Sequence, residues 1–222
     1  NALIEIESNF LEKNVSLLHG VTSSGKTEIY VNLIEKELNR NNQVLYLVPE
    51  ISLTTQLIVR LKKYFGDKLL VYHSKYSLDQ RTEIWKNVLK SSGKIILGAR
   101  SSIFLPYNSL SLIIVDEEHE NAFKQFNPAP RYNARDCAIY LGMLHGAKTL
   151  LGSATPSVES YFNAISNKYG LIKIIKRYND IELPNILLND LKESTIKNKM
   201  IGSFSEILLS NIKSTLINKK QV

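Results

Sequence analysis

The 222-residue sequence holds a single cysteine, Cys137, and no apolar run long enough to span a bilayer. One cysteine excludes an internal disulfide framework and is typical of a reducing compartment. The four histidines lack the spacing of zinc ligands, since they are scattered at His19, His73, His119 and His145. These absences argue against a disulfide scaffold, a zinc module and a membrane protein, and we expect a cytoplasmic protein without a membrane partner.

Positive charge is in excess, with a net charge of +7 and an isoelectric point near 9.3. Such a balance favours a polyanionic partner. Many of the charges fall near the C-terminus, however, where lysines can equally form the solvated faces of helices. These residues are Lys192, Lys197, Lys199, Lys213, Lys219 and Lys220.

Short apolar runs alternate with longer amphipathic runs, which is the pattern of βαβ units around a parallel sheet. The expected strands are Val15–Leu18, Val44–Val48, Leu69–Tyr72, Lys94–Leu97, Leu112–Val115, Thr149–Leu151 and Leu171–Ile174. The expected helices are Lys26–Asn39, Leu53–Phe65, Gln80–Lys90, Ala134–His145 and Val158–Asn167. Because the strands are apolar throughout, the sequence predicts an α/β fold with helices on both faces of a mostly parallel sheet.

The composition shifts after about residue 177. The stretch 178–199 carries Pro184 and many polar residues, with one possible short strand at Ile186–Asn189. Ser203–Leu216 then has the period of an amphipathic helix. We expect one domain over residues 1–177, followed over residues 178–222 by a linker and the opening elements of a second, incomplete unit.

A phosphate-binding loop is indicated by residues 20–27, which read G-x-x-x-x-G-K-T between an apolar run and a helical run. Glycines let the backbone N–H groups point at an anion, and the following helix adds partial positive charge. The alternative is a Gly/Ser-rich turn that precedes Gly-Lys-Thr by chance. The residues expected to bind a nucleoside triphosphate are Gly20, Val21, Thr22, Ser23, Ser24, Gly25, Lys26 and Thr27.

Asp116 and Glu117 follow the apolar run Ile113–Val115 and are expected to complete the nucleotide site. At the C-terminal end of a strand, Asp116 can hold Mg²⁺ through a water molecule. The Thr27 hydroxyl can bind Mg²⁺ directly. Glu117 can orient and deprotonate an attacking water. The alternative is an acidic helix N-terminus that complements the helix dipole.

Small polar residues follow other predicted strands. The hydroxyl groups of the triplet Ser153-Ala154-Thr155 can hydrogen-bond the acidic segment and sense the γ-phosphate. The alternative is a strand-to-helix turn with a Ser/Thr cap, which has the same pattern. Residues 48–54 (VPEISLT) and 98–102 (GARSS) offer N–H and hydroxyl groups suited to nucleic-acid phosphates. Ligands of open α/β sheets gather at the carboxyl ends of the strands, where all these segments are expected to lie.

The order of these motifs resembles the first motor lobe of superfamily 2 helicases, and more closely the primosomal protein N′ (PriA) family of bacterial replication-restart DNA helicases. The segments that carry the resemblance are GVTSSGKTEIY (20–30), LVPEISLTTQ (47–56), His73-Ser74 with GARSSIFLP (98–106), VDEEHE (115–120), PRYNARD (130–136) and LGSATPSVES (151–160). PRYNARD and PEISLT are not general helicase features, so the resemblance is specific. Ser23 is a departure, because many family members carry another glycine there.

The resemblance implies a RecA-like P-loop NTPase lobe of three α/β/α layers. Residues 1–177 would form helicase lobe 1, which binds ATP and Mg²⁺, and residues 178–222 the start of a truncated lobe 2. Lys26, Asp116 and Glu117 would be catalytic, and Thr27 and Asp116 would be the metal ligands. Ser153, Ala154 and Thr155 would form the motif that couples hydrolysis to movement.

The stretch 123–135 interleaves aromatic and basic side chains, the ingredients of base stacking with phosphate contact. Pro128 and Pro130 favour an irregular, exposed loop. The resemblance implies that this is the family's aromatic-rich loop, which links single-strand binding to hydrolysis; the alternative is aromatics packed on the core. The expected DNA-contacting residues are Phe123, Lys124, Phe126, Arg131, Tyr132 and Arg135.

The resemblance also implies parts of the family protein that this sequence lacks: an upstream DNA-binding domain, a glutamine-containing element, a zinc-binding cysteine cluster and a second motor lobe with an arginine that completes the ATP site. Zinc is therefore expected only in the full-length protein, and the isolated lobe is expected to hydrolyse little ATP. Implied partners are single-stranded and forked DNA, the primosome and single-strand-binding proteins, with a nucleoid-associated location in the cytoplasm.

The function expected from the sequence is an ATP-dependent 3′–5′ DNA helicase of replication restart. One alternative is another superfamily 2 DNA translocase, of the branch-migration or restriction type. A second alternative is a non-catalytic scaffold that binds ATP or DNA, which the intact Lys26, Thr27, Asp116 and Glu117 speak against.

Overall fold

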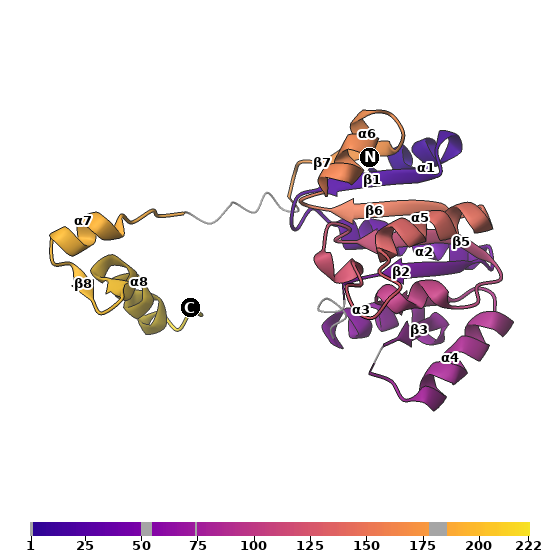
Figure 1. The fold of residues 1–222 in the computed structure, drawn as a ribbon, viewed down its shortest axis with the longest axis horizontal. Coiled ribbons are helices and arrows are strands. Elements are labelled where there is room, and N and C mark those ends of the chain that lie inside the picture. The colour runs from indigo at the N-terminus through magenta and orange to yellow at the C-terminus, as the bar shows by residue number, and fades with distance from the viewer. Residues whose placement is uncertain (1, 50–54, 74, 178–185) are drawn as a thin grey trace. The chain divides into compact units, whose positions relative to one another are not determined.

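The computed structural model describes residues 2–49, 55–73, 75–177 and 186–222. The described residues fall into two compact units, one ending at residue 177 and one beginning at residue 186 (Figure 1). Across these ranges, every helix is too short or too polar to cross a membrane. The predicted site segments lie in the first unit, apart from residues 50–54 and Ser74, which are outside the described residues.

In the described part of the first unit, seven parallel strands form a single sheet (Figure 1). Their order across the sheet is β3 (Leu69–Tyr72), β4 (Ile95–Gly98), β2 (Gln43–Leu47), β5 (Leu110–Asp116), β6 (Lys148–Ser153), β1 (Val15–Gly20) and β7 (Gly170–Ile174). All neighbouring pairs are parallel. The seven strands predicted from the sequence are confirmed, with small shifts at their ends.

Helices cover both faces of this sheet (Figure 1). One face carries α1 (Ala2–Glu12), α2 (Lys26–Asn39) and α3 (Thr55–Phe65), and the other carries α4 (Leu78–Lys90), α5 (Ala134–His145) and α6 (Val158–Ile165). Along β2, Val44 and Tyr46 enter the first core while Leu45 and Leu47 enter the second. The strands are therefore buried on both sides, and the predicted three-layer α/β/α architecture is confirmed.

Local signals explain where these helices begin. Gly25 precedes α2 with a φ of 86°, a left-handed conformation that glycine adopts without steric cost. Ser77 and Gln80 form a capping box at the start of α4, and Asn133 and Ser157 cap α5 and α6. The sequence did not predict α1, and the predicted start of α3 at Leu53 lies outside the described residues.

The second unit contains α7 (Leu191–Ile196), a hairpin of β8 (Met200–Ile201) and β9 (Phe204–Ser205), and α8 (Glu206–Ile217). The strand predicted at Ile186–Asn189 is wrong, because this stretch has no regular structure and Leu188 is 95% exposed. An apolar run becomes a strand only beside another strand that accepts its hydrogen bonds, and none of the described residues supplies one there. The final helix is confirmed, beginning at Glu206 after a Ser205 cap.

Candidate nucleotide site and the network behind it

The predicted site segments meet at the carboxyl edge of the sheet because their strands are neighbours. β1 lies beside β6, with His19 opposite Ser153, so the loop that follows β1 adjoins the end of β6. β6 in turn lies beside β5, with Gly152 opposite Asp116. This is the edge at which open α/β sheets bind their ligands.

The loop at 20–27 is sharply bent and contains two residues in the left-handed conformation. Ser23 and Gly25 both have positive φ values, of 62° and 86°. Lys26 arches back over the loop, and its Nζ donates to the carbonyl of Gly20 at 2.8 Å. A Cβ on Gly20 would lie 2.8 Å from Ser24 Oγ, so the loop is tightly wound.

One buried group in this loop fits a phosphate ligand. Ser24 Oγ is buried and has no hydrogen-bond partner among the described residues. An unpartnered buried hydroxyl is costly, and phosphate oxygens are the acceptors for which such a loop is shaped. Ser23 has a left-handed backbone, which strains its Cβ. Glycine has no Cβ and would avoid this strain, which explains why glycine suits the position.

Asp116, at the end of β5, is held by three donors. Tyr30 Oη donates to its Oδ1 at 3.0 Å, and Tyr46 Oη donates to its Oδ2 at 3.1 Å. The backbone N–H of Glu117 donates to Oδ1 at 3.1 Å. Burial raises the pKa of the Asp116 carboxyl and the neighbouring Glu117 carboxylate raises it further, while the tyrosine donors and Lys26 act in the opposite direction.

The two tyrosines are neutral donors. Burial raises the pKa of both hydroxyls well above the ordinary value, and the negative charge of Asp116 adds to the rise. Tyr30 lies on α2, one turn beyond Lys26, and Tyr46 lies on β2. The carboxylate of Asp116 is therefore fixed by the loop's own helix and by an adjacent strand.

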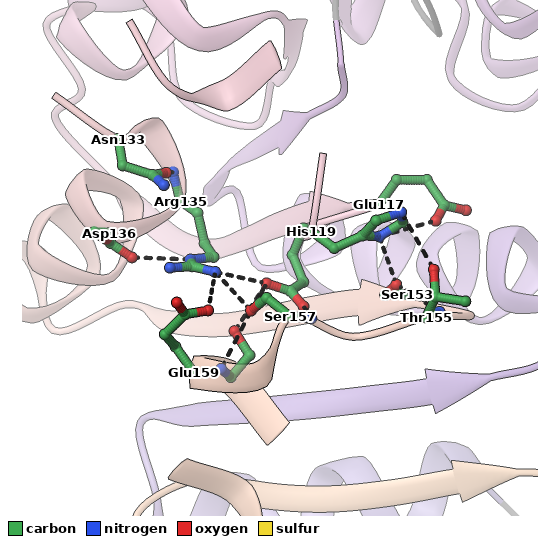
Figure 2. A network of polar contacts seen from close by, with 11 residues as sticks. Glu117, His119, Asn133, Arg135, Asp136, Ser153, Thr155, Ser157 and Glu159 are labelled. Atoms are coloured by element: carbon green, nitrogen blue, oxygen red, sulfur yellow. Dashed lines mark hydrogen bonds and ion pairs between the residues drawn. The ribbon is translucent and has the colours of Figure 1, made fainter. Parts of the chain in front are cut away.

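Glu117 and His119 connect the acidic segment to the end of β6 (Figure 2). Glu117 has a φ of 49°, and its Oε2 lies 3.7 Å from His119 Nδ1. His119 Nδ1 is 2.8 Å from Ser153 Oγ, and its Nε2 is 3.3 Å from Thr155 Oγ1. The structure thus brings together the acidic segment and the 153–155 triplet, as the sequence predicted from their positions at the ends of strands.

A second network lies behind this one and centres on Glu118, which is 2% exposed. Arg135 from the start of α5 reaches Glu118 Oε2 at 3.2 Å and donates to Ser157 Oγ at 2.7 Å (Figure 2). Ser157 N donates to Glu118 Oε1 at 2.7 Å, and Ser160 Oγ donates to Oε2 at 2.8 Å. The network therefore joins the segment after β5, the end of the 123–135 loop and the start of α6.

Two of the six predicted DNA contacts are contradicted by burial. Phe123 is 1% exposed and packs in the core, so its ring is not available to a base. Arg135 is 9% exposed, and its guanidinium is bound to Glu118 and Asp136 rather than open to a phosphate. Aromatic and basic composition predicted the loop, yet composition does not reveal which way a side chain points.

The remaining loop residues are more accessible. Phe126 is 66% exposed, Arg131 is exposed, and Lys124 Nζ donates to the Arg131 carbonyl at 3.0 Å. Tyr132 is half-buried and packs edge-on against Phe104 at 5.1 Å between ring centroids. Arg100 of the GARSS segment secures the loop by donating to the Lys124 carbonyl at 3.0 Å.

The sequence assigned no role to several residues of the site. Four of the five nevertheless lie inside segments that carry the family resemblance, at 20–30, 115–120 and 151–160, and Tyr46 lies outside them. The five residues are Tyr30, Tyr46, Glu118, Ser157 and Ser160.

Several known proteins are similar to this chain. A family model described as DEAD/DEAH box helicase matches residues 5–163. The chain is 44% identical over 208 residues to "Replication restart protein PriA" of Rickettsia felis, which covers 93% of this chain and 32% of that protein. It is 40% identical over 210 residues to the protein of the same name from Bacillus subtilis, which covers 95% of this chain and 26% of that one. The chain thus spans about a third or less of these curated relatives.

Solved structures show the same fold at lower sequence identity. The structure of RecG bound to a three-way DNA junction aligns with a TM-score of 0.53 and 18% identity, over 82% of this chain and 24% of that one. The architecture and the phosphate loop define the class as a RecA-like P-loop lobe. Since the family model matches most of its length, the chain belongs to the DEAD/DEAH box helicase family. A helicase domain implies ATP together with a divalent metal ion.

Proposed function

We propose that this chain is the ATP-binding motor lobe of an ATP-dependent 3′–5′ DNA helicase that acts in replication restart. The observation that carries the proposal is the meeting of the phosphate loop with Asp116 and Glu117 at one edge of the sheet. The similarity to two proteins named for replication restart supports the biological role. Residues 1–177 would be helicase lobe 1, and residues 178–222 would lead into lobe 2.

The loop and the acids have complementary roles in this proposal. Lys26 binds the β- and γ-phosphates, and backbone N–H groups of the loop help to hold the phosphate chain. The N–H groups of Val21 and Ser24 are not among them, because they donate to the carbonyls of Ile174 and Val21. Thr27 and Asp116 are the residues that would hold Mg²⁺, which neutralises phosphate charge when bound. One or two protein ligands suffice for Mg²⁺, because substrate phosphates and waters complete its shell.

Glu117 is the proposed general base. Its left-handed backbone turns the side chain to the side where His119 lies, 3.7 Å away. From there the carboxylate would orient the attacking water and accept its proton. Ser153, Ala154 and Thr155 are the proposed coupling motif. His119 contacts the Ser153 and Thr155 hydroxyls and would link this motif to the presence or absence of the γ-phosphate.

DNA would bind along the carboxyl edge beside the 123–135 loop. A small cavity there is lined by Val48, Arg100, Ser101 and Gln125, which belong to the strand-end segments and to the loop. We propose exposed Phe126 for base stacking, with Lys124 and Arg131 for phosphate contact and Tyr132 as support. The partners in this proposal are single-stranded and forked DNA, and in the cell the primosome and single-strand-binding protein.

Unwinding polarity tests the function directly. The whole protein that contains this chain should unwind a forked duplex with a 3′ single-stranded tail when ATP and Mg²⁺ are present, and should not unwind one with only a 5′ tail. The Glu117→Gln variant should lose about 100-fold or more of the unwinding rate, the usual contribution of a general base. Glu120→Gln is the matched control. Equal unwinding from both tails, or full activity of Glu117→Gln, would overturn the proposal.

A further inference from the structure

Both oxygens of Asp116 accept a hydrogen bond from a tyrosine. Tyr30 Oη is 3.0 Å from Oδ1 and Tyr46 Oη is 3.1 Å from Oδ2. Both tyrosines are 0% exposed, and their rings pack edge-on with centroids 5.6 Å apart. We call this pair, with the carboxylate between the hydroxyls, the tyrosine clamp.

A third element leaves room for the clamp. A Cβ added to Gly152 on β6 would lie 1.8 Å from Tyr30 Oη and 3.5 Å from Asp116 Oδ1. Only a glycine at this point of the strand lets the tyrosine hydroxyl reach the carboxylate. Tyr30 on α2 and Tyr46 on β2 therefore bind the carboxylate at the end of β5, and Gly152 on β6 leaves space for the Tyr30 hydroxyl.

Core packing alone does not account for this arrangement. A buried tyrosine needs a hydrogen-bond partner, and a backbone carbonyl serves, as Ser102 O does for Tyr107 Oη at 2.8 Å. Tyr30 and Tyr46 instead share the carboxylate of Asp116, whose partial burial costs free energy. Two neutral donors orient the carboxylate without cancelling its charge, which leaves that charge for a cation.

We propose that Tyr30 and Tyr46 are positioning residues that orient the Asp116 carboxylate and set its affinity for the divalent metal. The inference deepens the proposed function, because it rests on Asp116 as a metal-holding residue. Groups that hydrogen-bond a metal-holding carboxylate typically change metal affinity about 10- to 100-fold when removed. Phenylalanine keeps both rings and removes only the hydroxyls, so it isolates this contribution.

The test is a Mg²⁺ titration of nucleotide binding to the whole protein. Affinity for a fluorescent ATP analogue is measured with EDTA and then across Mg²⁺ concentrations, for the wild type and for Y30F, Y46F and the double variant. The Mg²⁺ midpoint should rise about 10-fold for each single variant and further for the double. Affinity in EDTA should stay as in the wild type, because the phosphate loop is intact.

Two controls separate the possible failures. Y107F also removes a buried tyrosine hydroxyl bond but does not touch Asp116, so its Mg²⁺ midpoint should not move. D116N should raise the Mg²⁺ midpoint at least as far as the double tyrosine variant does, because Thr27 and the phosphates remain as metal ligands. Midpoints for Y30F and Y46F within two-fold of wild type, alongside a D116N variant whose midpoint rises about 10-fold or more, would overturn the clamp alone. A D116N variant with unchanged Mg²⁺ dependence would overturn the proposed metal role, and the clamp with it.

Discussion

Asp116 and Glu118 are two carboxylates two positions apart, and their surroundings are opposite in kind. Asp116 is partly exposed and is held by two neutral tyrosine hydroxyls and a backbone N–H. Glu118 is buried and is held by the Arg135 guanidinium and by two serines. An acid with neutral donors keeps its charge for a ligand, whereas an acid paired with arginine has its charge neutralised within the protein. We therefore expect Asp116 to act on the nucleotide and its metal ion, and Glu118 to hold the surrounding segments together.

Backbone strain divides in the same way. Ser23 and Glu117, which belong to the nucleotide side, have left-handed φ values of 62° and 49°. Arg135 and Ser160, on the Glu118 side, lie within the first turns of regular helices. Strain that the surrounding structure maintains is common at functional sites. In this comparison, the residues with strained backbone are therefore those proposed to act on the nucleotide.

The largest expected effect is on the Glu118 side. Glu118→Ala should lower the free energy of unfolding by about 3 kcal/mol, because it removes the buried acceptor of two serine hydroxyls and leaves Arg135 only its more exposed partners, Asp136 and Glu159. Chemical denaturation of the 222-residue chain measures this. Replacing Glu118 and Arg135 together with methionine should restore most of the loss, since an apolar pair of similar volume carries no buried charge. A loss below about 1 kcal/mol for Glu118→Ala would place this acid with surface ion pairs instead.

Asp116→Asn should stabilise the nucleotide-free chain, in contrast to Glu118→Ala, and should raise its Tm at neutral pH. Burial raises the pKa of Asp116 in the folded state, so the folded protein binds this proton more tightly than the unfolded chain does. Stability is therefore lost as pH rises from about 4, the ordinary aspartate value, through the raised value. Asparagine does not titrate, so the Tm difference between variant and wild type should grow with pH over this interval. A difference independent of pH would contradict the assignment.

The smallest expected effect is at the phosphate loop. Ser23→Gly should raise the free energy of unfolding by about 1 kcal/mol, because it removes a Cβ from a left-handed residue. Glycine also gains freedom in the unfolded chain, which offsets part of the benefit. Gly93→Ala, at a position with a φ of 63° outside the site, should destabilise the chain and serves as the reciprocal control. A destabilising Ser23→Gly would show that the serine hydroxyl matters more than the strain.

Local patterns predicted most of the fold and the segments that meet at the carboxyl edge of the sheet. The continuous apolar strands, the G-x-x-x-x-G-K-T spacing and the acids after β5 are each readable within a few residues. The clamp could not be predicted in this way, because Tyr46 and Asp116 are 70 positions apart and meet only when β2 pairs with β5. A tyrosine inside an apolar run carries the same signal whether its hydroxyl meets a carboxylate or a backbone carbonyl.

The errors have the same origin. Phe123 and Arg135 were expected at the DNA because they alternate with basic and aromatic neighbours, but the core and Glu118 hold them. The strand expected at 186–189 has the right composition and, among the described residues, no strand beside it. Contacts between distant segments decide burial, and burial decides which of several suitable side chains can act on a ligand.

The most direct test of the account is single-strand-stimulated ATP hydrolysis by the whole protein carrying Asp116→Asn, Glu117→Gln or Glu118→Gln. Glutamine at 118 keeps one acceptor oxygen, which can still accept from the Ser157 N–H, so it perturbs the network less than alanine and allows comparison in a folded protein. The account predicts that the variants at 116 and 117 lose about 100-fold or more of the stimulated rate, while the variant at 118 retains most of the rate per folded molecule. Hydrolysis that survives at 116 and 117 but is lost at 118 would contradict it.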